Sequence, residues 1–422
     1  MAQTTNKDDK KMQSTKYRRS SIYTLMLDDA GLVKADTIKR CFEGAPLPDK
    51  FDDQTLSIRS FNPLSYPLTE EEKLQKNNLG KTLGKGLLSE LSGGLVDTTG
   101  VKDLPLIIQN FFKANRIPQQ LVAKWFNRDD NGNFNMDLVA TRGQYDATEM
   151  QASIAKATVR GTSLLADAGE ELIGNTFVVV SRFKYVKKEE VMKAAKRGLG
   201  MLEKYGGNFG QIAAKVGNVA ADVASKGYVI QTNSYLYKLV WNDSISNIFY
   251  SNYWMDASSN SPEKKMAFDT TNLFKLELVG LDKAWADVQS TIFTTKSDEE
   301  LIRRATIKAV DAVIAKLQKK HDVFKTKTPL FTVEPLSAKI GLKEGLEKGD
   351  KFEVLEQTID DNGRTKYIRK GVVKVDDQIW DNRYMAGEEQ TADSTGTKPL
   401  IDRTLFKGGE KFYPGMLIRQ IR

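Results

Sequence analysis

The chain has 422 residues, of which 40% are hydrophobic and 28% are charged, and it carries a net charge of +8. This is ordinary for a soluble protein of two or three domains, and no run of about 18 apolar residues is present to cross a bilayer as a helix. Residues 1–20 hold six cationic and two acidic side chains, so 6 − 2 = +4 of the net charge lies there. We therefore expect a disordered basic tail over residues 1–20 and no nucleic-acid partner for the rest of the chain.

Cysteine and histidine are each present once, as Cys41 and His321. A single cysteine forms no internal disulfide and no cysteine-based metal site, and a single histidine makes multi-histidine metal centres and histidine-dependent triads poor candidates. We expect Cys41 to be a half-buried apolar residue and His321 to lie at the C-terminal end of a helix. The prediction is that the chain has no catalytic residue, metal or cofactor.

The first hundred residues show three short elements and one helix start. The pattern predicts a strand over 21–27, a helix over 36–42 and a strand over 56–61. Thr69 and Glu72 stand at capping-box spacing, which indicates the first turn of a helix.

The segment Gly80-Lys81-Thr82 resembles the end of a phosphate-binding loop. The motif needs another glycine five residues before Gly80, where Gln75 stands, and the run before it is helical rather than strand-like. We interpret the segment as a glycine-rich surface stretch.

An acidic loop over 127–133 follows a helix that begins at Pro105. An EF-hand interpretation with Gly132 in the sixth place puts Leu138 where the loop needs a bidentate glutamate. A hairpin turn on Asn131-Gly132 needs no such exception, and we favour it over a metal site.

The stretch from Asp146 to Val186 is expected to form the centre of the larger domain. Asp146 and Glu149 indicate the start of a helix that Gly169 ends. The strand over 176–186 is apolar on both faces in its first half, which predicts a central strand. In its second half Arg182 and Lys184 alternate with aromatic residues, so that one face returns to water.

An insertion follows over residues 187–226 and has the pattern of one or two amphipathic helices rich in small residues. Packing on the sheet is one interpretation of its apolar face, and contact with a protein partner or a membrane surface is the other. The residues of this face are Leu199, Leu202, Phe209, Ile212, Val216, Val219 and Val223.

Further strands are predicted over 228–230, 235–241 and 273–279, while the aromatic-rich stretch 244–254 suits a strand or a helix. Ser297 and Glu300 form a second capping box and open a helix that runs to His321.

Beyond Thr326, short strands alternate with glycine turns, a pattern typical of a small β-barrel over 326–422. Strands are expected over 352–356, 367–375 and 416–421, with a turn at 361–363 and a mobile loop over 386–398.

The segment 340–354, Ile-Gly-Leu-Lys-Glu-Gly-Leu-Glu-Lys-Gly-Asp-Lys-Phe-Glu-Val, together with 413–418, Tyr-Pro-Gly-Met-Leu-Ile, resembles the SH3-like barrel of bacterial envelope assembly proteins such as the flagellar-assembly T protein. Residues 21–25, 48–51 and 169–180 are similar to a family of extracytoplasmic bacterial proteins, and more remotely to the α/β domain of curli-type secretion proteins. The resemblance implies assembly at the outer membrane without catalysis. The chain lacks the lipobox cysteine of the curli lipoproteins.

We predict an α+β protein: a mixed sheet with covering helices over 21–325, followed by the SH3-like barrel over 326–422. The expected function is that of a non-enzymatic cell-envelope scaffold with protein partners or a second copy of itself. Binding of a cell-wall glycan or peptide and hydrolysis by paired carboxylates are the alternatives. We expect a periplasmic or outer-membrane-associated protein if a signal peptide has been removed, and a cytoplasmic one otherwise.

Overall fold

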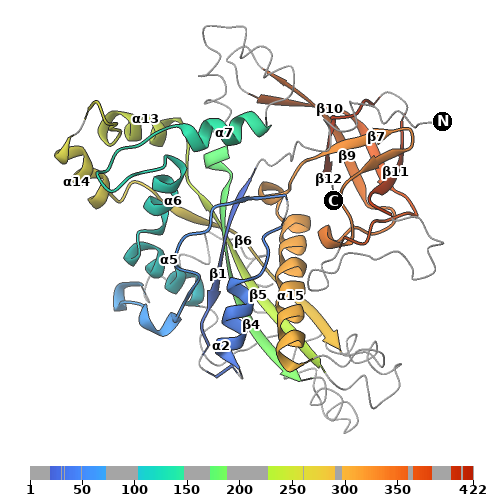
Figure 1. Ribbon diagram of the computed structural model, residues 1–422, viewed down its shortest axis with the longest axis horizontal. Helices are drawn as coiled ribbons and strands as arrows, with labels where there is room; N and C mark the ends of the chain where they lie inside the picture. The colour runs from blue at the N-terminus through green and yellow to red at the C-terminus, as the bar shows by residue number, and fades with distance from the viewer. Residues whose placement is uncertain are drawn as a thin grey trace, which may run out of the picture.

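The computed structural model describes residues 20–72, 103–146, 172–187, 227–289, 297–359, 365–382 and 401–421, apart from residues 30, 33, 49, 260, 410 and 411. Their architecture is α+β, as predicted: a mixed sheet covered by helices on both faces, and an antiparallel barrel beside it (Figure 1). No helix in these ranges is long and apolar enough to span a membrane.

The mixed sheet has the order β2-β1-β4-β5-β6, with β3 also paired to β1. Strand β1 pairs in parallel with β2, β3 and β4, whereas β4, β5 and β6 follow one another antiparallel. The strands are β1 (Ser21–Leu27), β2 (Asp52–Asp53), β3 (Ser60–Phe61), β4 (Thr176–Lys187), β5 (Gly227–Leu239) and β6 (Leu276–Gln289).

Strand β4 is central, as its apolar first half predicts. It lies between β1 and β5, and Thr176 to Ser181 are buried on both faces. Farther along, Phe183 is buried and Lys184 is exposed, so the alternation predicted for the second half is confirmed. Strand β5 joins the two predicted strands 228–230 and 235–241 into one.

Alternation along the strands divides the core into two layers. Tyr23 and Val178 point into a layer with helices α5 (Leu104–Ala114), α6 (Ile117–Trp125), α13 (Asp243–Asn252) and α14 (Pro262–Thr270). Ile22 and Phe177 point into the opposite layer, with α2 (Ala35–Glu43) and α15 (Asp298–Lys320). Figure 1 shows α15 running along its face of the sheet, between the sheet and the barrel.

The helix starts predicted at Thr69 and Ser297 carry cap bonds. The Thr69 hydroxyl accepts the Glu72 amide at 3.2 Å while the Glu72 carboxylate accepts the Thr69 amide at 3.0 Å. The Ser297 hydroxyl accepts the Glu300 amide at 3.2 Å. His321 directly follows α15, as expected, and its amide donates to Leu317.

The predicted hairpin on Asn131-Gly132 is wrong. The turn is real, because the Asp129 carboxylate accepts the Asn133 amide at 2.8 Å and Gly132 has φ of +94°. It joins two helices, α6 and α7 (Asp137–Asp146), rather than two strands. Pro118 in the first turn of α6 suits helix, and the apolar run that follows it does not by itself distinguish helix from strand.

The predicted helix start at Asp146 is also wrong, because Asp146 is the last residue of α7. The Asn135 side chain accepts the Asp137 amide at 3.1 Å and begins this helix nine residues earlier. The part of the prediction that runs to Gly169 falls mostly on residues outside the described ranges.

The predicted strand 56–61 is a strand only at β3. The Arg59 carbonyl before it accepts the Met26 amide at 3.0 Å, and side-chain contacts hold Leu56 and Ile58. The Tyr23 hydroxyl donates to the Ile58 carbonyl, and Leu56 and Ile58 pack against the core. The aromatic stretch 244–254 is mostly helix α13, whose N-terminus is capped by Asn242.

The six C-terminal strands close into a barrel in the order β10-β11-β8-β7-β12-β9. They are β7 (Thr328–Val333), β8 (Leu336–Ala338), β9 (Lys351–Ile359), β10 (Thr365–Val375), β11 (Thr404–Gly408) and β12 (Leu417–Gln420). The expected barrel is thus present, while its likeness to the SH3-like class stays a prediction. The expected turn at 361–363 and loop at 386–398 lie outside the described residues.

The barrel rests on α15 through the short helix η4 (Leu342–Glu344). Gly345, which ends η4 with φ of +71°, faces Ala315 of α15. Lys319 of α15 lies 3.5 Å from the Asp350 carboxylate, and Lys50 of the body donates to the Lys339 carbonyl at 2.8 Å. The body and the barrel therefore meet through specific polar contacts.

Candidate functional site

The seven candidate partner- or membrane-facing residues, from Leu199 to Val223, lie outside the described residues, so their role stays a prediction. The strands that carry the insertion are described. Lys187 at the end of β4 pairs directly with Tyr228 of β5, and Gly227 pairs with Gln289 at the end of β6. The insertion therefore leaves and rejoins the sheet at neighbouring positions of one end.

The residues that suggested other chemistry have structural surroundings. Asp129 in the acidic loop also binds the Asn133 side-chain amide at 2.9 Å, and no described cluster of acidic, cysteine or histidine side chains has the form of a metal site. Cys41 is half-buried, and burial raises the pKa of its thiol. The segment Gly80-Lys81-Thr82 lies outside the described residues.

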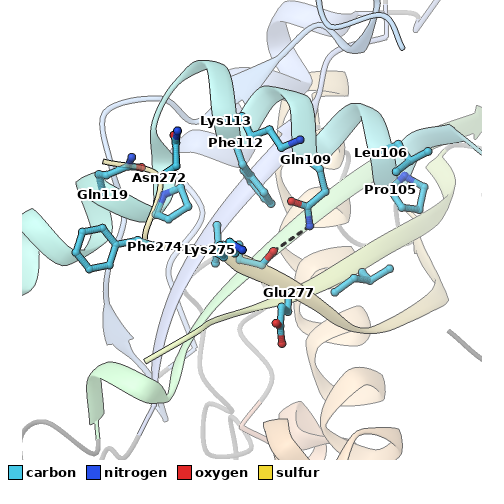
Figure 2. Close-up of a pocket in the computed structure, with 13 residues that line it drawn as sticks. Pro105, Leu106, Gln109, Phe112, Lys113, Gln119, Asn272, Phe274, Lys275 and Glu277 are labelled. Carbon is cyan, nitrogen blue, oxygen red and sulfur yellow. Dashed lines mark hydrogen bonds between the residues drawn. The ribbon is translucent and has the colours of Figure 1, made fainter. Parts of the chain in front are cut away.

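A groove of about 730 Å³ lies between helix α5 and the beginning of strand β6 (Figure 2). This volume is within the range of about 300–1,000 Å³ that is common for ligand sites. Its lining comes from α5, from the start of α6 and from the segment that leads into β6: Pro105, Leu106, Gln109, Phe112, Lys113, Pro118, Gln119, Asn272, Phe274, Lys275, Leu276, Glu277 and Leu278.

Buried aromatic and aliphatic side chains form the floor of the groove. Phe112 is buried in α5 and meets Tyr237 of β5 edge to face, with 4.9 Å between the ring centroids. Leu276 and Leu278 face the same side of the sheet because successive side chains of a strand point to opposite faces. Leu276 is buried, whereas Leu278 is only partly covered. The floor is therefore fixed by the core.

Side-chain amides of α5 and α6 hold in place the segment that leads into β6 and lines the opposite side of the groove. Gln109 of α5 donates to the carbonyl of Leu276 at 2.9 Å, the bond drawn in Figure 2. Gln119 of α6, itself buried, donates to the carbonyl of Thr271 in the segment before β6. The two bonds position the start of β6 beside α5.

Strand β6 is an edge strand: among the described residues it pairs with β5 alone. Residues of an antiparallel strand alternate in directing their backbone groups toward and away from the neighbour. The Lys275 carbonyl accepts the amide of Val240, which directly follows β5. The backbone amide and carbonyl groups of Lys275 and Glu277 therefore point toward β5. Leu276, whose carbonyl accepts from Gln109, consequently directs its backbone groups away from β5. The same alternation assigns the outward direction to Leu278, which adjoins the register shift before Gly280.

Two side chains donate hydrogen bonds to carbonyl groups of β6 that point away from β5. One is Gln109, on Leu276; the other is Lys316 of α15, which donates to the Lys283 carbonyl at 2.6 Å. Both supply a hydrogen-bond donor where a neighbouring strand would supply one. Leu278 lies between these two carbonyls, beside a register shift that separates it from Gly280 in the pairing with β5.

The polar rim of the groove carries two ammonium groups and one carboxylate, from Lys113, Lys275 and Glu277. Its lining contains no serine, threonine, cysteine or histidine. The groove thus combines an apolar floor, a strand edge and a charged rim.

The sequence predicted neither the groove nor its residues. Gln109 is the one local signal, a polar residue within the apolar run 104–112 of α5. Its role depends on β6 being the edge strand, and edge position is a property of the topology.

No protein-family model matches the chain, and no curated protein is detectably similar to it in sequence. The function is therefore argued from the geometry of the groove.

Proposed function

We propose that the protein is a non-enzymatic interaction scaffold that binds an extended polypeptide as an added strand along β6. The observation that carries the proposal is the edge strand β6 beside an apolar groove, where the Gln109 amide supplies the Leu276 carbonyl with the donor that an added strand would replace. An added strand gains affinity from main-chain hydrogen bonds and specificity from pockets for alternate side chains. The groove provides both.

The chemistry of the bound segment follows from the groove. Every second side chain of an added strand points to the side of Phe112 and Leu276, so these positions should be apolar. The others face the side of Lys275 and Glu277, where polar side chains fit. The expected ligand is a segment of alternating apolar and polar residues.

Binding of a fluorescently labelled, end-capped peptide of three Val-Thr repeats tests the proposal by anisotropy. Two isomers carry N-methyl groups, one on the valine amides and one on the threonine amides. Only one set of amides faces β6 in an added strand, so one isomer should lose binding and the other should keep it. Two lost hydrogen bonds of about 0.5–1.5 kcal/mol each weaken binding about 5- to 150-fold.

Equal affinity of the two isomers would contradict strand addition, whether both bind or neither does. The variant Leu106→Asp supplies a matched test of the apolar wall, since Leu106 is only partly buried. A carboxylate there should weaken peptide binding while the free energy of unfolding stays within about 1 kcal/mol of the wild type.

We further propose that this scaffold acts at the cell envelope, outside the cytoplasm. The support is the resemblance of segments 340–354 and 413–418 to envelope assembly proteins. Fractionation of cells of the source organism with an antibody against the chain tests the location. Recovery in the periplasmic or outer-membrane fraction supports the proposal, and exclusive recovery in the cytoplasm contradicts it.

A further inference from the structure

Three lysines form a row across the outside of the barrel. Lys374 of β10 stands directly opposite Lys351 of β9 on one side and directly opposite Lys407 of β11 on the other. All three side chains are exposed. We call these three residues the lysine ladder.

Like charges that stand directly opposite on neighbouring strands destabilise the pairing. The described carboxylates nearest to the ladder are engaged: Asp376 binds Lys407 at 2.5 Å, and Glu353 binds Arg419 at 2.6 Å. The Asp350 carboxylate accepts the Gln420 amide at 3.0 Å and faces Lys319 of α15. Among the described residues, none therefore forms an ion pair with Lys351 or Lys374.

The ladder borders a shallow hollow of about 490 Å³ on the barrel surface. Arg369 adds a fourth cationic group to its lining, and Val372 and Ile421 contribute apolar surface. Arg369 lies 3.9 Å from Glu353, which is already bound by Arg419, so it too retains charge toward the hollow.

We propose that the lysine ladder binds a linear chain of phosphate groups. Neighbouring strands are about 4.8 Å apart, so the ladder sets three ammonium groups in a line over about 10 Å. Lysine acts as a point charge that suits phosphate oxygens without a fixed bidentate geometry. A single phosphate engages part of this line, whereas linked phosphates extend from Lys351 and Lys374 toward Arg369 and toward Lys407, whose ammonium group is shared with Asp376. The site lies on the barrel and is independent of the peptide groove.

Titration calorimetry of the full chain with tripolyphosphate at low salt tests the proposal. Tripolyphosphate should bind at least about tenfold more tightly than orthophosphate, and Lys374→Gln should weaken its binding by about tenfold or more, because it removes a charge-assisted contact. Lys366→Gln is the matched control, an exposed lysine of β10 outside the ladder. This variant should change the affinity less than twofold.

Equal loss of affinity in the two variants, or equal binding of tripolyphosphate and orthophosphate, would overturn the proposal. A second readout uses the protein without ligand. Because Lys374 is repelled from both sides, Lys374→Gln should raise the Tm of the free protein and reduce the further rise on adding tripolyphosphate. A lower Tm of the free variant would show that Lys374 is already neutralised, and this would overturn the site.

Discussion

The substitution Leu278→Pro distinguishes the backbone groups of β6 that point toward β5 from those that point away from it. Proline has no amide hydrogen, and the alternation along β6 from Lys275 assigns the amide of Leu278 a direction away from β5. Proline is tolerated in an edge strand when the missing donor faces outward. The substitution should thus leave the β5–β6 ladder intact while it removes one donor to the added strand.

The expected magnitude follows from comparison with Leu278→Ala. Both variants truncate a partly buried side chain that packs against the core, which we expect to cost about 1–2 kcal/mol of stability. Only proline removes the amide, worth about 0.5–1.5 kcal/mol in a net hydrogen bond. The proline variant should therefore bind the Val-Thr peptide about 2- to 13-fold more weakly than the alanine variant.

Peptide anisotropy and urea unfolding together provide the assay, with Glu277→Pro as the inward control. Glu277 pairs with Lys238 of β5, so proline there removes a ladder hydrogen bond and should destabilise the fold more than Leu278→Pro does. Equal peptide affinity of Leu278→Pro and Leu278→Ala would refute strand addition. A loss of stability in Leu278→Pro as large as in Glu277→Pro would refute the assigned direction of the Leu278 amide.

Two further predictions concern the barrel and α15. Gly341→Ala should destabilise the barrel by about 1–3 kcal/mol in chemical unfolding, because the added Cβ would lie 2.1 Å from the Trp380 carbonyl oxygen. An unchanged midpoint would show that the segments bridged at Gly341 and Trp380 separate freely. Hydrogen bonds from Arg303 and Arg304 hold the pKa of Glu300 below its ordinary value. The ionised carboxylate therefore stabilises the fold at any pH above its unfolded pKa of about 4.3. This contribution is lost as the pH falls through the lower pKa of the folded state. Glu300→Gln should accordingly be less stable than the wild type at pH 7 and equally stable at the acidic end of a pH series of urea unfolding, and a difference that persists in acid would contradict the ion pairs.

The sequence predicts those elements whose signals are local. The strand Ser21–Leu27, the apolar first half of β4 and the helix capped by Ser297 each combine a periodic pattern with a boundary residue. The structure confirms all three. Local patterns suffice there because the burial of the side chains agrees with the propensity of the chain.

Predictions failed where one local signal had two structural contexts. Asn131-Gly132 forms a tight turn, but the turn does not determine whether the flanking runs are strands or helices. Asp146 is an acidic residue that suits a helix start, and yet it ends a helix that Asn135 begins. Phe126 and Phe134, which flank the turn, pack edge to face in the aromatic core, a contact that no local pattern records.

The peptide groove and the lysine ladder lay beyond prediction for a topological reason. Gln109 and Leu276 are 167 residues apart, and Lys351 and Lys407 meet only across Lys374. Neither juxtaposition leaves a periodic trace in the sequence.

Amide hydrogen exchange at Leu278, followed by NMR with and without the Val-Thr peptide, tests the central claim most directly. The account predicts that the Leu278 amide exchanges rapidly in the free protein and slowly in the complex. The Glu277 amide, which faces β5, should exchange slowly in both. Saturating peptide that leaves the exchange rate of Leu278 unchanged would contradict strand addition at β6.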